Sequence, residues 1–376
     1  MDGPCMDRLL ERKEVCICGG SGGVGKTTAS AAIAAGMAAR GRKVAVLTID
    51  PARRLADSLG LPELGNEERL VDPGRFEAAG IEMKGELWAL MLDAKRTFDE
   101  VVEWHAPDEQ TRDAVLGNRI YQELSNAVAG SQEYMAMEKL HELHQEGRYD
   151  LLVLDTPPSR HALDFLDAPR RLSRFIDSRS LQLFTAPGRF GLRVLGRGTG
   201  VVFSVLGRAT GVDVLEDLSE FFRSFGGMVE GFRERAERVN ALLGDSRSTF
   251  VVVTSPTPEA VEEAIFFHHR LLDSGLPFGG AIVNRVHEVG DGAGHGGAET
   301  EVRELVGDRL AGKVLRTLED YRRLAERDRR GVEHLCESLG RKPLLCVPHF
   351  DDDVHDIAGL VHMNRYLFGD SPARAE

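Results

Sequence analysis

The sequence has little cysteine and no cysteine pair of the kind that binds zinc. Its 376 residues include five cysteines, an odd number, and none forms a C-x-x-C pair. They are Cys5, Cys16, Cys18, Cys336 and Cys346. This usage disfavours both a disulfide scaffold and a zinc knuckle, and predicts a protein of the reducing cytoplasm.

Long apolar runs and net positive charge are also missing. The most apolar stretch, residues 200–206, is far shorter than the ~20 residues of a membrane-spanning helix. Residues 1–15 are charged and lack the apolar core of a secretory signal. The net charge is -13, so we expect no nucleic-acid partner, because phosphate binding needs a positive field. We therefore expect a cytoplasmic protein that could still be peripheral at a membrane.

What the sequence does contain is a repeated alternation of short apolar runs with helical stretches. Seven runs are predicted as strands: residues 15–18, 43–49, 87–92, 151–154, 250–254, 281–283 and 344–347. Most are apolar throughout, which is typical of strands that are buried on both faces of a parallel sheet. The alternation predicts an α/β fold with a doubly wound, mostly parallel sheet.

Two long regions without a convincing strand interrupt this alternation, and we interpret them as helical insertions. The predicted division is a first core part (14–92), a helical insert (93–149), a core strand (150–164), a helical, basic and apolar subdomain (165–245), a second core part (246–368) and a tail (369–376).

The strongest motif is a glycine-rich loop that matches G-x-x-x-x-G-K-[ST]. Its residues are Gly20, Ser21, Gly22, Gly23, Val24, Gly25, Lys26, Thr27 and Thr28. A predicted strand precedes it and an alanine-rich helix follows, so a coincidental turn is the weaker interpretation. Backbone N–H groups of such a loop surround phosphates, and the helix N-terminus favours the anion. Lys26 would reach the β- and γ-phosphates of ATP, and the Thr27 hydroxyl would bind Mg²⁺.

Two aspartates follow predicted strands. Asp50 comes after residues 43–49, and Asp155 comes after residues 151–154. Ligands of open α/β sheets bind at the carboxyl ends of strands, so we expect both carboxylates to face the phosphates. Each could hold Mg²⁺ or position the attacking water, and the alternative is a helix-capping or turn aspartate.

These motifs, with several later ones, resemble the ArsA-type anion-transporting ATPase family, whose other branch targets tail-anchored membrane proteins. The matching stretches are residues 20–28, 50–52, 155–163, 252–259, 282–285 and 347–350. Within the family, residues 132–139 and 165–169 are most similar to an actinobacterial subgroup. The likeness spans roughly residues 15–367, with the helical insertions matched only in placement.

The resemblance implies a deviant-Walker P-loop ATPase that works as a nucleotide-driven dimer coupled to a hydrophobic client or membrane protein. It implies that Lys26, Asp50 and Asp155 are catalytic and that Thr27, Asp50 and Asp155 surround Mg²⁺. Asp50 would orient the hydrolytic water, and Thr28 would support the α-phosphate. Asn284 would bind adenine, with Pro348 and Phe350 lining the base pocket.

The sequence also departs from the family pattern. The signature lysine of the loop falls at Ser21, which is short and neutral. Either a homologous partner supplies the lysine in a heterodimer, or Arg53 or Arg54 replaces it in a homodimer. The zinc-binding cysteine pair of the targeting branch is absent. Cys336 and Cys346 are the only thiols near an arsenite position, and we expect both to be buried and free.

Residues 168–212 are unusually basic, with eight arginines and one acid among apolar and glycine residues. Such a segment could cover a hydrophobic client or lie on an anionic membrane, or it could pack on its own subunit. Other functions stay open: an arsenite-pump subunit, a positioning or partition ATPase, a small-molecule kinase, or a nucleotide-binding regulatory subunit with a catalytic partner.

Overall fold

The computed structural model describes residues 5–50, 52–119, 121–122, 131–156, 229–289, 298–340 and 342–369. The chain divides into two compact units. The first combines residues 1–90, 147–162 and 244–376, and the second combines residues 91–146 and 163–243. The boundaries that we predict for the insertions stay a prediction.

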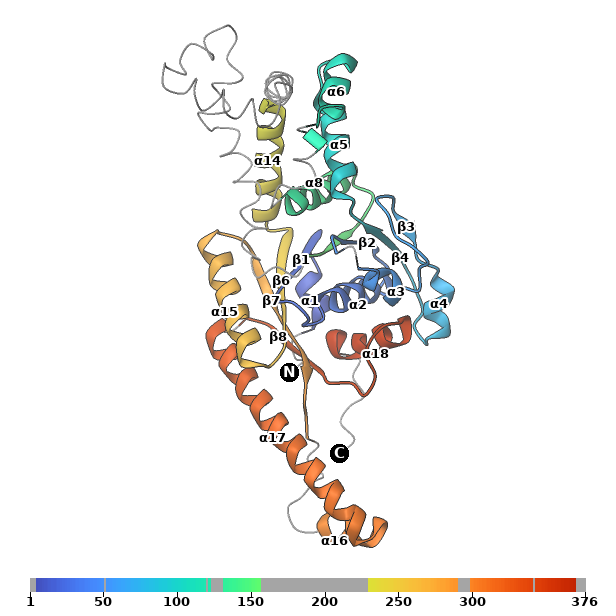
Figure 1. Cartoon of the computed structure of the whole chain (residues 1–376), viewed down its shortest axis with the longest axis vertical. Helices are drawn as coiled ribbons and strands as arrows, with labels where there is room; N and C mark the ends of the chain where they lie inside the picture. The colour runs from blue at the N-terminus through green and yellow to red at the C-terminus, as the bar shows by residue number, and fades with distance from the viewer. Residues whose placement is uncertain are drawn as a thin grey trace, which may run out of the picture. The chain divides into compact units, whose positions relative to one another are not determined.

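An eight-stranded sheet forms the centre of the first unit, in the order β3-β4-β2-β5-β1-β6-β7-β8 (Figure 1). The strands are β1 (Val15–Gly19), β2 (Lys43–Thr48), β3 (Arg69–Leu70), β4 (Glu86–Met91), β5 (Leu151–Asp155), β6 (Ser248–Thr254), β7 (Phe278–Val286) and β8 (Leu344–Pro348). Parallel pairing joins β2 to β5, β5 to β1, β1 to β6, β6 to β7 and β7 to β8. The short β3 pairs antiparallel with β4. The predicted α/β fold with a mostly parallel sheet is confirmed.

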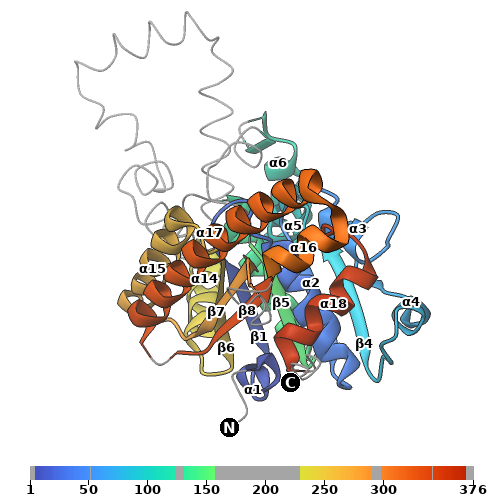
Figure 2. The ribbon, with the colours of Figure 1, turned by 90° about the horizontal axis from the view of Figure 1, so that it is seen from below.

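The central strands are apolar because helices flank the sheet. Every residue of β1, β5 and β6 is buried. The helices of this unit are α1 (Met6–Leu10), α2 (Lys26–Ala39), α3 (Arg54–Ser58), α4 (Pro73–Ala78), α15 (Pro258–Asp273), α16 (Ala298–Val306), α17 (Asp308–Leu339) and α18 (Ile357–Phe368). Helix α2 packs on β1, β2 and β5 and against α18, while α17 runs beside α15 (Figure 2).

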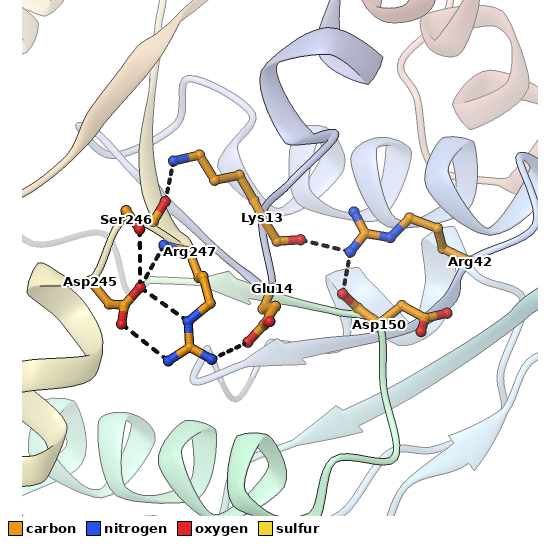
Figure 3. Close-up of polar contacts among 7 residues, drawn as sticks. All are labelled: Lys13, Glu14, Arg42, Asp150, Asp245, Ser246 and Arg247. Atoms are coloured by element: carbon orange, nitrogen blue, oxygen red, sulfur yellow. Dashed lines mark hydrogen bonds and ion pairs between the residues drawn. The ribbon is translucent and has the colours of Figure 1, made fainter.

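Polar contacts join the amino-terminal ends of the central strands (Figure 3). Arg42 donates to the carbonyl oxygens of Leu10 (2.9 Å), Lys13 (2.6 Å) and Asp150. Beside it, Lys13 Nζ donates to the carbonyl of Ser246 at 2.5 Å. Arg42 precedes β2, Lys13 precedes β1, Asp150 precedes β5 and Ser246 precedes β6. This network therefore fixes the starts of four strands to one another.

An ion pair extends the same network. Arg247 donates to both carboxylate oxygens of Asp245 at 3.1 Å and to Glu14 Oε2 at 3.1 Å. The Arg247 side chain and backbone N–H lower the pKa of Asp245 to about 2. Asp245 follows the last helix of the second unit along the chain, so the point at which the chain re-enters the sheet is tied down.

The described part of the second unit is helical. It contains α5 (Ala94–His105), α6 (Glu109–Leu116), α8 (Ser131–Glu146) and α14 (Val229–Gly244). Arg235 forms an ion pair with the buried Glu138, and its guanidinium lies 5.0 Å from the centre of the Trp104 ring. The basic segment at residues 168–212 lies outside the described residues. Within the described residues, no helix is long and apolar enough to cross a membrane.

Candidate functional site

The glycine-rich loop lies between β1 and α2, and its backbone requires glycine. Gly20, Gly23 and Gly25 have φ angles of 148°, 78° and 93°, in the left-handed region that side chains disfavour. A Cβ atom on Gly20 would lie 2.0 Å from the carbonyl oxygen of Val253, and one on Gly25 would lie 2.4 Å from Asn284 Nδ2. Conformation and close neighbours thus both select glycine at Gly20 and Gly25.

Lys26 is the first residue of α2 and returns over the loop. Its Nζ donates to the carbonyl oxygen of Ser21 at 2.7 Å, and the residue is only 6% exposed. Burial lowers the pKa of Lys26, while the negative charges of Asp155 and Asp50 act in the opposite direction. An anion above the loop would therefore meet a poorly hydrated ammonium group.

Asp155 ends β5 beside the first turn of α2. Its Oδ2 accepts hydrogen bonds from Thr27 Oγ1 at 2.6 Å and from Thr48 Oγ1 at 2.9 Å. Its Oδ1 is buried without a hydrogen-bond partner among the described residues. Burial raises the pKa of Asp155 to about 6, although the two hydroxyls and Lys26 act to lower it. A carboxylate with one unpaired buried oxygen is suited to a cation.

Asp50 lies in the loop after β2, where its role is less distinctive. Its Oδ1 accepts from the backbone N–H of Ala52 at 3.0 Å, and its own N–H donates to Thr48 Oγ1 at 3.2 Å. The hydrogen bond from Ala52 is typical of an aspartate that stabilises a turn, which is the alternative to a catalytic role for Asp50. Thr48 contacts both aspartates, so it links their positions.

A cavity of about 320 Å³ adjoins the loop at the start of α2. Gly25 and Thr28 line it, together with the predicted base-pocket residues Asn284, Pro348 and Phe350. Asn284 also contacts the loop directly, because its Nδ2 donates to the carbonyl of Val24 at 2.9 Å. The structure thus brings residues from two distant parts of the chain to one cavity.

A larger cavity, of about 640 Å³, borders residues 21–24 of the loop. Ser21 lines it, and the Ser21 hydroxyl is buried without a hydrogen-bond partner among the described residues. Arg285 and Arg327 also line it, together with Glu259 and Glu263. Cations and carboxylates thus share this cavity.

Of the two alternative cations, Arg54 lies closer to the site. It lines the smaller cavity, and its charge contributes to lowering the pKa of Lys26. Arg53 is exposed and lines neither of the two cavities.

Sequence reasoning assigned no role to Thr48, Arg285, Arg327, His287 or Asp328, although Arg285 lies in the matching stretch 282–285. Thr48 carried a usable signal, because it is a hydroxyl residue at the carboxyl end of an otherwise apolar strand. Arg285 lies on β7 and His287 directly follows it, while Arg327 and Asp328 lie on α17. All four are far along the chain from the glycine loop, which borders the larger cavity. No spacing in the sequence connects them to the loop.

The cysteines divide into core and surface residues. Cys16 and Cys18 are buried on β1. The prediction that Cys336 is buried is wrong, because it faces solvent on α17; Cys346 is half-buried, and burial raises its pKa to about 11. Among the described residues, no three histidine, cysteine, aspartate or glutamate side chains are grouped as for a metal. Mg²⁺ differs from such metals, because it takes phosphate, hydroxyl and water oxygens with one or two carboxylates.

The glycine loop between a buried strand and a helix, with Lys26 and Thr27 at the start of that helix and Asp155 at the carboxyl end of β5, defines a P-loop nucleotide-binding α/β protein. The family model described as "Anion-transporting ATPase" matches residues 13–291. The chain belongs to this family, whose members are ATPases.

Individual relatives agree with this assignment. The chain is similar to the "ATPase get3" of Aspergillus terreus, with 28% identity over 255 residues that cover 66% of this chain and 67% of the relative. The "ATPase GET3" of Malassezia globosa is 28% identical over 259 residues, covering 66% of each. A "Putative arsenical pump-driving ATPase" of Halobacterium salinarum is 33% identical over 175 residues, which are 46% of this chain and 26% of that protein.

Proposed function

We propose that this protein binds and hydrolyses Mg·ATP and that its nucleotide state switches a dimer coupled to a hydrophobic client or membrane protein. The observation that carries the proposal is the pairing of Thr27 with Asp155 at 2.6 Å beside the glycine loop, with one oxygen of Asp155 left unpaired among the described residues. A hydroxyl and a carboxylate in this arrangement are the protein ligands of Mg²⁺ in P-loop ATPases.

The residues of the site fit a Mg²⁺ ion and a triphosphate. Thr27 and Asp155 would hold the ion, which when bound supplies positive charge to the phosphate oxygens. The loop N–H groups and Lys26 would bind the phosphates. Asp50 would orient water for hydrolysis, and Asn284, Pro348 and Phe350 would hold the adenine. The raised pKa of Asp155 supports the assignment, because a bound cation would offset the cost of its buried charge.

The first test is calorimetry of Mg·ATP binding by the unaltered protein and by the Lys26→Ala variant. We expect Lys26→Ala to weaken binding by about tenfold to a hundredfold, because a charge-assisted hydrogen bond contributes about 1.5–3 kcal/mol. Lys84→Ala removes an exposed lysine and is the matched control. Tight binding by Lys26→Ala would refute the assignment of the loop.

A second test separates binding from hydrolysis. If Asp50 orients the attacking water, Asp50→Asn keeps ATP affinity within about twofold but lowers turnover by about a hundredfold or more. The measurement is nucleotide affinity beside phosphate release, with Asp57→Asn on α3 as the control. Equal turnover in the Asp50→Asn variant and the unaltered protein would leave Asp50 with only its turn contact to Ala52.

The client and the dimer are proposed from the family and from the sequence. Relatives include an "ATPase get3" and a "Putative arsenical pump-driving ATPase". We favour a hydrophobic client or membrane surface over arsenite for two reasons. The basic and apolar segment at residues 168–212 suits a client or membrane. Cys336 is exposed on a helix, and the described residues contain no group of three side chains that could bind a metal ion. The protein would be cytoplasmic and peripheral at the membrane when it acts.

The client proposal predicts that deleting residues 179–208 preserves ATP affinity but removes association with anionic lipid vesicles. Co-sedimentation with vesicles containing phosphatidylserine measures this. Continued association would show that this segment is not the contact. Stimulation of ATP hydrolysis by arsenite would instead favour the second candidate, an oxyanion-pump subunit, and measurable hydrolysis only with a homologous partner would favour a regulatory subunit.

A further inference from the structure

Helix α17 contains a fully buried carboxylate in a helix that is otherwise mostly exposed. Four of its 32 residues are buried: Ala311, Asp328, Leu335 and Leu339. Asp328 has no exposed surface. A buried charge is costly unless it is paired, so the contacts of Asp328 decide what the helix holds in place.

Asp328 binds the end of β7 through two hydrogen bonds to one residue. Its Oδ2 accepts from the backbone N–H of His287 at 3.0 Å and from His287 Nδ1 at 2.7 Å. Its Oδ1 accepts from Arg327 Nε and a terminal nitrogen, at 3.0 and 2.7 Å. Burial acts to raise the pKa of Asp328, but these hydrogen bonds outweigh it and the pKa is lowered. An ionised carboxylate only accepts, so Nδ1 of His287 carries the proton and the ring orientation is fixed.

The oriented ring of His287 supports the loop after β8. It stacks on the ring of His349, with centres 4.7 Å apart and planes at 19°. Tyr321, two turns before Asp328 on α17, meets His287 edge-on at 5.4 Å. His349 itself lines the smaller cavity, between Pro348 and Phe350. Support for His349 is therefore support for one wall of that cavity.

Strand pairing beside this wall is irregular but present: Val286 lies opposite Pro348, and the His349 N–H donates to the Val286 carbonyl at 2.9 Å. The register between β7 and β8 shifts between Val283 and Val286, beside Asn284. Arg285 has a φ angle of 62°, in the left-handed region that a side chain disfavours. Next to this irregularity, the contacts of Asp328 with His287 add fixed side-chain geometry to the single backbone hydrogen bond between Val286 and His349.

We propose that Asp328 is a positioning residue for the nucleobase side of the nucleotide site, acting through His287 and His349. The inference rests on the proposed function, because it takes the smaller cavity as the base pocket. It makes the affinity for the base, but not for the triphosphate, depend on α17. The phosphate-binding residues Lys26, Thr27 and Asp155 have no contact with this chain of residues among the described hydrogen bonds.

The test compares ATP with inorganic triphosphate, which has the same charged tail and no base. Calorimetry with Mg²⁺ measures the affinity of each for the unaltered protein and for Asp328→Asn. An asparagine amide cannot accept from His287 and Arg327 together, so one set of contacts is lost. We expect Asp328→Asn to weaken ATP binding by about tenfold and triphosphate binding by less than about twofold, as for the loss of one hydrogen bond to a charged group.

Two further variants keep the test decisive. Asp320→Asn makes the same chemical change at an exposed position of α17 and should change neither affinity. His287→Ala removes the ring that stacks on His349 and should likewise weaken ATP binding but not triphosphate binding. If circular dichroism shows that Asp328→Asn is unfolded, the result for His287→Ala tests the proposal in its place. Unchanged ATP affinity, or equal weakening of both ligands, would overturn the inference. Failure of the unaltered protein to bind either ligand would refute the proposed function as well.

Discussion

Replacing Asp155 by asparagine should make the protein without nucleotide more stable at neutral pH while it weakens Mg·ATP binding. The raised pKa of Asp155 means that the folded protein disfavours the ionised form. A pKa of about 6, against the ordinary 3.8, corresponds to about 3 kcal/mol of destabilisation once the group is ionised in both states. The asparagine that replaces it could still accept from Thr27 and Thr48, so the variant keeps the packing without the charge.

The sign of the pH dependence follows from proton counts. Between pH 3.8 and about 6, the folded state holds a proton on Asp155 that the unfolded state has lost. The free energy of unfolding of the unaltered protein therefore falls as pH rises through this window. The variant lacks this contribution, so its advantage should grow from about pH 4.5 to about pH 7 and stay constant above that.

Urea denaturation from about pH 4.5 to about pH 8 measures the difference. The exposed Asp320→Asn is the control and should show a small, nearly constant difference. Saturating Mg·ATP should stabilise the unaltered protein by several kcal/mol and the Asp155→Asn variant by less, since ligand binding stabilises in proportion to the logarithm of affinity. A variant that is less stable than the unaltered protein at about pH 7.5, or an advantage that does not depend on pH, would refute the reasoning.

Three more predictions follow from the loop and from the strand starts. Gly25→Ala should weaken ATP binding at least about tenfold in calorimetry, because the added Cβ would displace the Asn284 amide. Gly23→Ala is the control: its φ angle is similar, but a Cβ there would meet open space. It should only lower the free energy of unfolding, by the ~1–2 kcal/mol of conformational strain. Ser21→Lys, which the larger cavity has room to accept, should raise phosphate release at least about tenfold if a signature lysine is what the dimer lacks; an unchanged rate would favour the arginine alternative. Arg42→Met should lower the free energy of unfolding by about 1–3 kcal/mol in urea without changing ATP affinity, and a change in affinity would contradict a purely structural role.

The fold was predictable where a strand is apolar along most of its length. The seven predicted strands are present because their residues are apolar on both faces. β7 was predicted too short, since Gly279 and Gly280 interrupt its apolar pattern and Asn284 ends it. β3 was missed because its two residues are both exposed and form no pattern. The local sequence is thus sufficient to predict that a strand exists, whereas the length of the strand depends on its pairing with the neighbouring strand.

The candidate site was predictable only in its local part. The glycines of the loop are required by its own backbone, so a short motif is sufficient to find them. The hydrogen bond from Asn284 to the Val24 carbonyl joins residues 260 positions apart, and resemblance to a family, not spacing, suggested that Asn284 belongs to the site. Asp328 could have been suspected from helical periodicity, because it lies seven residues before the buried Leu335 on the face of α17 that packs inward.

The position of Asp155 at the end of β5 also places the proposed Mg²⁺ ligand near the second unit in the sequence. The next segment of that unit begins at Leu163, eight residues after Asp155. An insertion or deletion between these two positions would therefore be expected to affect cation binding, whereas one between Gly244 and Ser248 would not.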